Sequence, residues 1–236
     1  NYYLEVNKAL AKSLKKLKAD LFVIHDPQPL ASWHFAERKE PAVSRIHIDL
    51  SAPNPKILNF FLPYLEDYDR IVFSLKQFVP QEIRSGKAVI IPPAIDPLTL
   101  KNRALSKKRA CEIISLFGIN PKKPIIAQVS RFDPWKDPNG VISAFRLARK
   151  KIPELQLILL GISSAKDDPD AQSLFIETKK YARNDPSIFL FFHLADLKGI
   201  SNDMMVNAVQ VSADIILQKS TREGFGLTAT EALWKS

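Results

Sequence analysis

Short runs of apolar, β-branched residues alternate along the chain with longer amphipathic stretches. The short runs predict strands at 21–25, 43–48, 70–74, 88–91, 124–129, 155–160, 188–192 and 213–217. Apolar positions at helical spacing predict helices at 3–17, 57–65, 107–117, 138–150, 171–183, 202–211 and 225–234. Strands that alternate with helices are typical of parallel sheets with right-handed crossovers, so the pattern indicates an α/β, doubly wound architecture.

Prolines gather between the fourth expected strand and the next helix, in the segment 91–97. A stiff connection of this kind predicts a domain boundary, with one domain at 1–97 and a second at 98–236. Residues 1–85 contain no glycine, although a nucleotide-binding domain of this type usually opens with a glycine-bearing turn after its first strand. The chain also begins without Met and ends directly after the last expected helix. We therefore expect a piece of a longer protein, in which both domains are incomplete.

The composition narrows the class of protein. A hydrophobic content of 46% can supply proper cores, which argues against a disordered or fibrous chain. The net charge of +9 fits a nucleic-acid surface, a membrane surface or a phosphate-bearing ligand, but the Lys-rich runs lie on helical stretches, and this favours solvated helix faces. Cys111, the single cysteine, can form no internal disulfide, and no apolar stretch is long enough to span a membrane. These features predict a soluble cytoplasmic protein.

A first group of candidate chemical residues directly follows the expected strand 124–129, in the segment Gln128-Val-Ser-Arg-Phe-Asp-Pro-Trp-Lys136. Arg131 and Lys136 emerge there at the carboxyl end of the strand, the edge at which open α/β sheets bind ligands. The planar fork of an arginine and the point charge of a lysine suit the two phosphates of a nucleoside diphosphate. From spacing alone, two solvated loop cations are an equal alternative.

A second group surrounds the start of the last expected helix, where Glu223 and Glu231 lie eight positions apart. Gly224 and Gly226 allow backbone N–H groups to approach a ligand, and the amino end of a helix favours anionic charge. The two carboxylates can accept hydrogen bonds from the paired hydroxyls of a sugar ring and a ribose. Taken one at a time, each glutamate is more often an ordinary helix residue.

Other patterns are weaker. The acidic run Asp167-Asp168-Pro169-Asp170 is similar to a divalent-metal triplet, but it precedes a helix and favours a capping loop. The histidines are scattered without zinc-site spacing, so no metal is expected. The aromatic segment 189–192 indicates strand core and not a base-stacking platform.

The segments 223–231 and 130–136 resemble two motifs of retaining glycosyltransferases with the two-domain GT-B architecture: the E-x7-E pattern and the donor-phosphate loop. Further segments are similar to trehalose glycosyltransferring synthases of glycosyltransferase family 4. These segments are His25-Asp-Pro-Gln-Pro-Leu30, Arg45-Ile-His-Ile-Asp-Leu-Ser51, Pro92-Pro-Ala-Ile-Asp-Pro97 and Ile216-Leu-Gln218. The likeness covers nearly the whole chain in the same order, and it implies two doubly wound Rossmann-like domains that face a cleft.

The resemblance implies transfer of glucose, with retention, from a nucleoside diphosphate glucose to glucose, giving trehalose, in a reaction that is reversible in principle. Neither a metal nor another cofactor is implied, nor a nucleic-acid or membrane partner, and the resemblance leaves a homodimer open. Its implied catalytic residues are Glu223, Arg131, Lys136, Asp26 and His47. Its implied donor-binding residues are Arg131, Lys136, Glu223, Gly224, Phe225, Gly226, Leu227 and Glu231, and its acceptor-binding residues are His25, Asp26 and Gln28.

Two alternatives stay open from the sequence. One is a protein without catalytic activity, either a fragment or homologue that holds a nucleotide sugar or a basic nucleic-acid binder. The other is a retaining transferase with a different acceptor, similar to sucrose or glycogen synthases. Acceptor choice separates the second alternative from a trehalose-forming enzyme.

Overall fold

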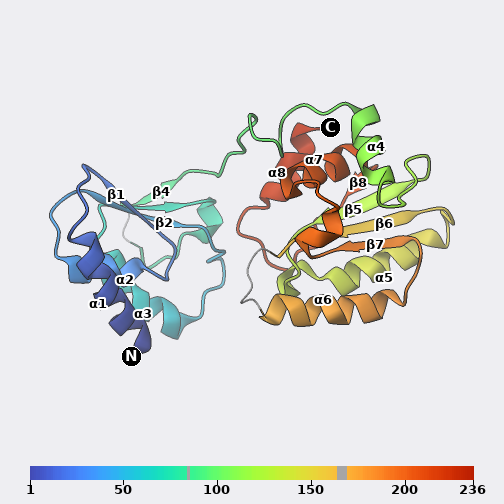
Figure 1. Cartoon of the computed structure of the whole chain (residues 1–236). Helices are drawn as coiled ribbons and strands as arrows, with labels where there is room; N and C mark the ends of the chain where they lie inside the picture. The colour runs from blue at the N-terminus through green and yellow to red at the C-terminus, as the bar shows by residue number, and fades with distance from the viewer. Residues whose placement is uncertain (84–85, 164–168) are drawn as a thin grey trace. The chain divides into compact units, whose positions relative to one another are not determined.

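The structure is a computed structural model that describes residues 1–83, 86–163 and 169–236. The described chain divides into two compact units, each with its own sheet (Figure 1). The N-terminal unit comprises Asn1–Pro93 together with Glu223–Phe225, and the C-terminal unit comprises Ala94–Arg222 together with Gly226–Ser236. The chain thus passes from one unit to the other within the proline-rich segment 91–97.

The N-terminal unit has a parallel sheet with the strand order β1-β2-β3-β4. Its strands are β1 (Phe22–His25), β2 (Ala42–Ile46), β3 (Arg70–Phe73) and β4 (Ala88–Ile90). Its helices are α1 (Tyr2–Leu14), α2 (Leu30–Ala36) and α3 (Pro55–Leu65), with a short 3-10 helix, η1 (Lys76–Phe78). Figure 1 shows the three α-helices together below the sheet.

Aromatic residues form much of the core of this unit. The rings of Phe22 and Trp33 lie 5.2 Å apart, and the buried Tyr68 donates its hydroxyl hydrogen to the carbonyl oxygen of Leu30 at 2.7 Å. Burial raises the pKa of Tyr68, so the phenol stays protonated and can act as this donor. Helix α2 thereby sits firmly against the sheet.

The C-terminal unit has a parallel sheet with the strand order β7-β6-β5-β8. Its strands are β5 (Ile125–Val129), β6 (Gln156–Leu160), β7 (Ile188–Phe191) and β8 (Ile215–Ile216). Its helices are α4 (Lys107–Ser115), α5 (Pro138–Arg149), α6 (Pro169–Ala182), α7 (Asn202–Ser212) and α8 (Leu227–Trp234), with the 3-10 helices η2 (Pro134–Lys136) and η3 (Leu194–Leu197).

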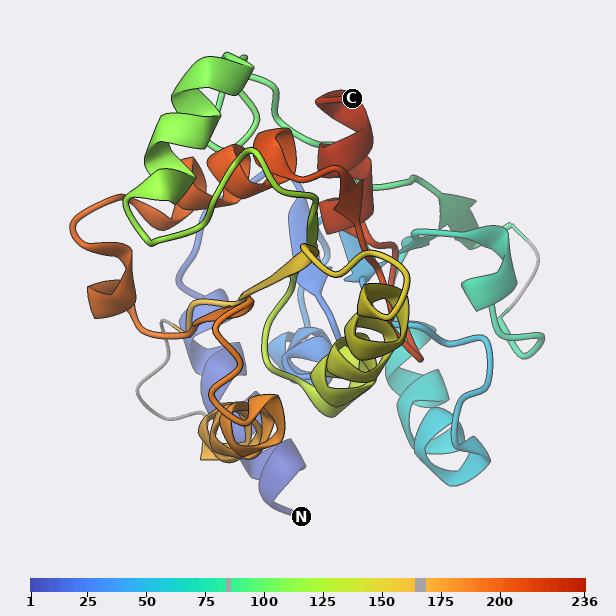
Figure 2. The ribbon, with the colours of Figure 1, turned by 90° about the vertical axis from the view of Figure 1, so that its right-hand side faces the viewer.

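Helices cover both faces of this sheet, with α5 and α6 on one face and α4 and α7 on the other (Figures 1 and 2). The strand residues alternate between the two layers as the pleat requires. Ile158 and Leu160 of β6 pack in the cluster that contains α4 and α7, whereas Leu157 and Leu159 pack with α5 and α6. Because both faces are buried, β5 and β6 are apolar at nearly every position, as expected for central parallel strands.

Several helices begin at a residue whose side chain caps the free backbone N–H groups of the first turn. The Oδ1 atom of Asn54 accepts from the N–H groups of Lys56 and Ile57 at the start of α3. Ser106 and Ser201 play the same part for α4 and α7. These caps explain why the helices begin where they do.

The expected α/β architecture is confirmed. Each predicted strand is present with its ends shifted by at most two residues, and each predicted helix with its ends shifted by at most three. The structure adds α2, which the periodicity did not indicate. Within the described part of the chain, no helix is both long and apolar enough to cross a membrane.

Candidate functional site

The connectivity of the C-terminal sheet defines a place for a ligand. From β5 the chain moves outward to β6 and β7, and it then returns to the other side of β5 to form β8. The loops that follow β5 and β8 therefore leave the same sheet edge in opposite directions. In open α/β sheets, ligands bind in the crevice at this switch point, outside the carboxyl ends of the strands.

Hydrogen bonds join the two loops at this switch point. The backbone N–H of Thr221 donates to the carbonyl oxygen of Trp135 at 2.8 Å. The side chain of Gln128, at the end of β5, reaches both loops: its Nε2 donates to the carbonyl oxygen of Lys136 at 2.8 Å, and its Oε1 accepts from the N–H of Lys219 at 3.2 Å. The buried Gln128 amide thus fixes the spacing of the two loops.

Basic side chains gather on these joined loops. Arg131 is 74% exposed, and its guanidinium lies 3.5 Å from a carboxylate oxygen of Asp133. Lys136 is half-buried at the end of η2. On the facing loop, the guanidinium of Arg222 lies 5.5 Å from the ring centroid of Trp135, and Lys219 forms an ion pair with Asp137. The arrangement can attract and neutralise an anionic ligand.

Asp137 has two tasks at the start of α5. Its Oδ1 caps the helix by accepting from the N–H of Gly140 at 2.9 Å, and its Oδ2 pairs with the ammonium of Lys219. The hydrogen bond from Lys219 holds the pKa of Asp137 below its usual range. A Cβ atom on Gly140 would lie 2.2 Å from Oδ2 of Asp137, so the close approach of the cap requires glycine there.

A cavity of about 620 Å³ lies between the loop after β5 and the first turns of α6. Arg131 and Trp135 line it from the loop, and Asp170 and Glu177 line it from the helix. Of the acidic run, Pro169 and Asp170 are the first two residues of α6, and Asp167 and Asp168 lie outside the described residues. Arg131 therefore faces an open volume that a ligand group can enter.

Gly161 follows β6 at the same sheet edge. A Cβ atom at this position would lie 2.1 Å from the carbonyl oxygen of Ser130, so the loop after β5 packs directly on the glycine backbone. A larger residue would displace the loop that carries Arg131. The sequence contains this signal, a glycine at the end of a strand, but it does not show which loop packs there.

Helix α8 carries the second predicted glutamate. Gly226 caps its amino end with a φ of 87°, in the left-handed region. A residue with a side chain adopts this conformation only with strain. Glu231 lies in the middle of the helix, where its side chain is 6% exposed and its Oε1 accepts from Nζ of Lys101 at 2.6 Å. The ion pair engages Oε1. Leu227, the first residue of α8, is exposed.

Glu223, Gly224 and Phe225 form the segment that leads into α8, and all three are half-buried. In the division of the described chain they are assigned to the N-terminal unit, whereas Arg222 and Gly226 are assigned to the C-terminal unit. Glu223 thus precedes α8, whereas Glu231 lies within it.

In the N-terminal unit the structure brings three predicted residues together at the carboxyl ends of β1 and β2. Nδ1 of His25 lies 2.8 Å from Nε2 of His47. Asp26 has a left-handed φ of 64°, and its Oδ1 accepts from the backbone N–H of His47 at 2.7 Å. A left-handed aspartate is uncommon, and this hydrogen bond explains its conformation.

Helix α1 positions the loop that carries the fourth predicted acceptor residue, Gln28. The buried Asn7 donates from Nδ2 to the carbonyl oxygen of Gln28 at 2.9 Å, and the hydroxyl of Tyr3 donates to the carbonyl oxygen of Pro27 at 2.7 Å. The side chain of Gln28 itself is exposed, close in sequence to His25. Sequence reasoning missed the supporting roles of Tyr3 and Asn7, because only the fold brings α1 to this loop.

The residues that the structure describes contain no group of three or more His, Cys, Asp or Glu side chains arranged to hold a metal ion.

Known families match both halves of the chain. Residues 1–80 match the family described as trehalose synthase, N-terminal domain, and residues 112–234, more than half of the chain, match the family described as glycosyl transferases group 1. The structure is similar to that of a UDP-forming α,α-trehalose-phosphate synthase from Burkholderia xenovorans in complex with glucose-6-phosphate. The TM-score is 0.78 at 15% identity, over 99% of this chain and 60% of that one. This likeness shows the GT-B fold class.

The chain belongs to the glycosyl transferases group 1 family. The trehalose synthase of Rubrobacter xylanophilus is 43% identical over 239 residues, which cover 99% of this chain and 56% of that protein. The trehalose synthase of Pyrococcus horikoshii is 44% identical over 233 residues, which cover 99% of this chain and 55% of that protein. The chain thus spans about half the length of the curated relatives it matches.

Proposed function

We propose that the protein containing this chain is a retaining glycosyltransferase, which moves glucose from a nucleoside diphosphate glucose to free glucose and forms trehalose. The family membership supports glycosyl transfer, and the identity of 43–44% to two trehalose synthases, along 99% of the chain, supports trehalose as the product. The observation that carries the proposal is the pair of joined loops at the switch point, with Arg131 and Lys136 on one of them.

The two cations act on the leaving group. When the bond between the glucose and the diphosphate breaks, negative charge grows on the departing phosphate oxygens. Arg131 can offer two parallel N–H donors to them, and Lys136 a mobile point charge. Stabilisation of charge that develops in the transition state is usually the largest single contribution to catalysis. We assign this role to Arg131 and Lys136.

The segment from Glu223 to Glu231 binds the rest of the donor. Gly224 and Gly226 leave backbone N–H groups accessible at the amino end of α8, where the helix dipole favours a phosphate. Glu231 accepts from the ribose, and Glu223 contacts the donor sugar. Phe225 and Leu227 complete the contact surface around the glycines.

In the N-terminal unit, His25, Asp26 and Gln28 bind the acceptor glucose, and His47 contacts the donor sugar. Carboxylate and imidazole groups can accept or donate hydrogen bonds to sugar hydroxyls, which is the chemistry that sugar recognition needs. The hydrogen bond from the His47 backbone to Asp26 holds these groups in one constellation.

No metal takes part in the proposed reaction, because the two loop cations supply the charge that a divalent ion would supply. Activity that is unchanged by a chelator would support this assignment. We also place the reaction in the cytoplasm, in keeping with a single cysteine and a charged donor that does not cross membranes unaided.

The test is a product assay on the full-length protein with UDP-, ADP- or GDP-glucose as donor and glucose as acceptor. Trehalose that appears with the nucleoside diphosphate in equal amounts is the expected result. Transfer to fructose or to a glucan, and not to glucose, would show that the acceptor is not glucose. Saturable donor binding without any transfer would favour a non-catalytic nucleotide-sugar-binding homologue.

A further inference from the structure

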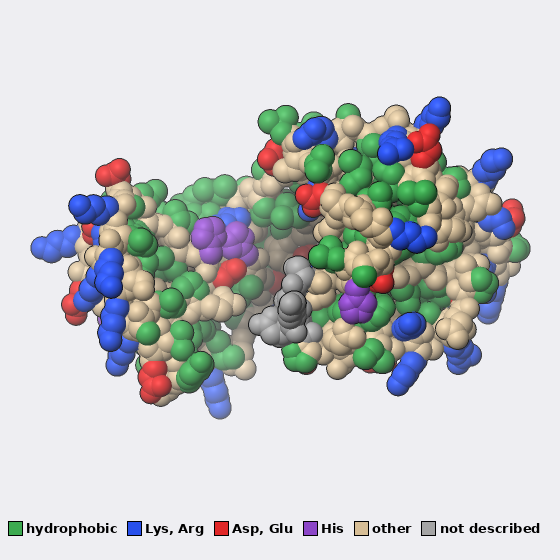
Figure 3. Space-filling model, in the orientation of Figure 1, with side chains coloured by type: hydrophobic (Ala, Val, Ile, Leu, Met, Phe, Trp, Pro, Cys, Tyr) green, Lys and Arg blue, Asp and Glu red, His purple; other side chains and the backbone are tan. Residues whose placement is uncertain are grey.

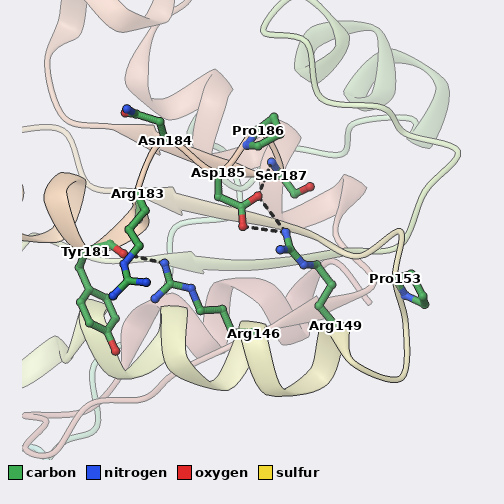
Figure 4. Close-up of a pocket in the computed structure, with 10 residues that line it drawn as sticks. Arg146, Arg149, Pro153, Tyr181, Arg183, Asn184, Asp185, Pro186 and Ser187 are labelled. Atoms are coloured by element: carbon green, nitrogen blue, oxygen red, sulfur yellow. Dashed lines mark hydrogen bonds and ion pairs between the residues drawn. The ribbon is translucent and has the colours of Figure 1, made fainter.

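A pocket of about 740 Å³ opens at the other edge of the C-terminal sheet, beside the amino ends of β6 and β7 (Figure 4). Its walls come from the last turns of α5 and α6 and from the segment 183–187, which leads into β7. Helix α5 begins directly after the loop that follows β5 and carries Arg131 and Lys136, here called the candidate donor loop, and it ends at this pocket. Its twelve residues span about 18 Å at the usual helical rise, so one small ligand cannot occupy both places.

Arg146 and Arg149 are held in fixed orientations in this pocket. Arg149 donates from Nη1 to Oδ1 of Asp185 at 2.8 Å and forms an ion pair with Oδ2 at 2.7 Å. Arg146 donates from Nη2 to the carbonyl oxygen of Tyr181 at 2.6 Å, and its guanidinium stacks over the Tyr181 ring at 5.0 Å. Each guanidinium has five N–H donors, so both keep donors for another acceptor.

Arg183 lies on the same pocket and differs from the other two arginines. Among the described residues, no hydrogen bond or ion pair involves its guanidinium. Arg183 and Asn184 are consecutive residues with left-handed φ values of 56° and 54°. Figure 4 shows the side chain of Arg183 directed toward Arg146 and Tyr181. Two like charges thus face each other with no carboxylate between them.

The charges around the pocket are unbalanced. Three arginines and one aspartate line it, and four lysines flank it in sequence on the ends of the same two helices: Lys150, Lys151, Lys179 and Lys180. Figure 3 shows Lys and Arg side chains gathered at the lower right end of the C-terminal unit. Basic residues in the last turn of a helix offset the helix dipole, which accounts for Arg146 and Arg149. It does not account for the guanidinium of Arg183, which forms no hydrogen bond to a carbonyl oxygen among the described residues.

We propose that this arginine pocket, defined by Arg146, Arg149 and Arg183, binds a phosphate dianion, either inorganic phosphate or the phosphate group of a small phosphate monoester. The planar fork of arginine matches the geometry of phosphate oxygens, and a dianion placed between Arg146 and Arg183 removes their mutual repulsion. The hydroxyl of Ser187 offers a further donor at the pocket wall, whereas the hydroxyl of Tyr181 is bonded to Oγ of Ser143 at 2.9 Å. The inference does not rest on the proposed transferase function, because the site lies at the other edge of the sheet.

A small anion fits the observations better than a nucleic acid. The arginine groups converge on a concave volume, and two of the three are oriented by partners inside it. A backbone of many phosphates would instead be expected to follow an extended row of exposed lysines and arginines, with a strong dependence on salt. The experiment must therefore distinguish binding of a small phosphate from binding of a nucleic acid.

The experiment is a calorimetric titration of the whole chain with inorganic phosphate and with glucose 6-phosphate, using glucose as the uncharged reference. Arg183→Gln is the informative variant, since the guanidinium of Arg183 has no hydrogen bond or ion pair with any described residue. Lys151→Gln is the matched control with the same change of charge. Lys136→Ala tests whether phosphate binds at the candidate donor site instead. Melting temperatures of Arg183→Gln and Lys151→Gln should agree.

We expect saturable binding that weakens at least tenfold in Arg183→Gln and is retained in Lys151→Gln and Lys136→Ala. Equal affinity for both ligands would identify free phosphate as the ligand, and tighter binding of the ester would identify a phosphate monoester; either supports the proposal. Absence of binding, equal binding in Arg183→Gln and Lys151→Gln, or loss in Lys136→Ala alone would overturn it. Binding of a single-stranded oligonucleotide but not of phosphate would replace it with a polyanion surface.

Discussion

Nδ1 of His25 lies 2.8 Å from Nε2 of His47, at the ends of two neighbouring parallel strands. The two rings are almost parallel, with an angle of 11° between them and centroids 5.1 Å apart. A hydrogen bond between two imidazoles needs an N–H on one ring and a lone pair on the other. In this contact one ring donates and the other accepts, and the contact holds the two side chains against each other.

Replacement of His47 by Ala should impair the full-length enzyme without unfolding it. We expect kcat/KM for trehalose formation to fall by about 10²-fold, because a positioned histidine at a reacting centre contributes at least this much. His34→Ala is the control. Nδ1 of His34 lies 2.8 Å from Oδ2 of Asp67, and His34 is not one of the predicted site residues. Steady-state kinetics and thermal melting of both variants test the prediction. Equal losses in the two variants would show that His47 has only a structural role.

The donor loop should bind nucleoside diphosphates through its cations. Lys136→Ala and Arg131→Ala are each expected to weaken binding of the diphosphate to the full-length protein by about 1.5–3 kcal/mol, the range for a lost hydrogen bond to a charged group. Lys122→Ala removes an exposed lysine from the loop before β5 and should leave the affinity unchanged. Calorimetric titration with UDP, ADP and GDP measures the effect. Unchanged affinity in both loop variants would remove this site assignment.

Glu231 needs a more careful substitution, because its carboxylate is buried against Lys101. Glu231→Ala would leave a lysine without its partner and could lower affinity through the fold. Glu231→Gln keeps the shape and an acceptor oxygen for the ribose. We expect it to weaken diphosphate binding by about 1 kcal/mol or more, in the range for one altered hydrogen bond. A loss of the same size for phosphate without a ribose would argue against a ribose contact.

Most of the fold follows from the hydrophobic pattern, and the exception has a physical cause. Helix α2 is short, and most of its residues, from Leu30 to Ala36, are buried. An element that is buried on nearly all sides has no polar face, so it lacks the period of an amphipathic helix. The strands of the two sheets are easier to predict from the sequence, since their apolar runs are short and bounded by polar loops.

Position along a strand predicted part of the candidate site, because His25 ends β1 and Arg131 lies just beyond the end of β5. In each unit the sheet topology then places the residue at the carboxyl edge of its own sheet. Lys219 and Lys101 could not be found in this way, because their roles depend on ion pairs with Asp137 and Glu231 that are distant in sequence. A run of basic residues says little about which charge it will meet in the fold.

The ion pair between Asp137 and Lys219 should contribute to stability in a way that depends on pH. The pKa of Asp137 is lowered in the folded chain, so its contribution is present above the unfolded pKa of about 3.9 and is lost as the pH falls through the folded value. Asp137→Ala should cost about 1–2 kcal/mol at pH 7, because it removes the cap of α5. The loss should shrink at pH 3. Urea unfolding at both pH values measures this, and a loss that does not change with pH would exclude the ion pair as its cause.

Lys235 should make stability rise with pH in the same direction, but in the alkaline range. Burial lowers its pKa from 10.5 to about 8, the neighbouring Lys101 adds to the shift, and Glu231 opposes it. Between pH 8 and 10.5 the unfolded chain therefore binds more protons at this position than the folded chain, and the free energy of unfolding rises with pH.

In Lys235→Met this rise should be absent. We expect the wild-type chain to gain on the order of 1 kcal/mol relative to the variant between pH 7.5 and 10, a figure reduced to allow for screening by solvent. Lys150→Met, at an exposed position, is the control and should follow the wild-type curve. Guanidinium unfolding across this pH range compares the three proteins. If the curves of Lys235→Met and the wild type stay parallel, the ammonium of Lys235 is not buried as its contacts with Gln210 and Asn102 indicate.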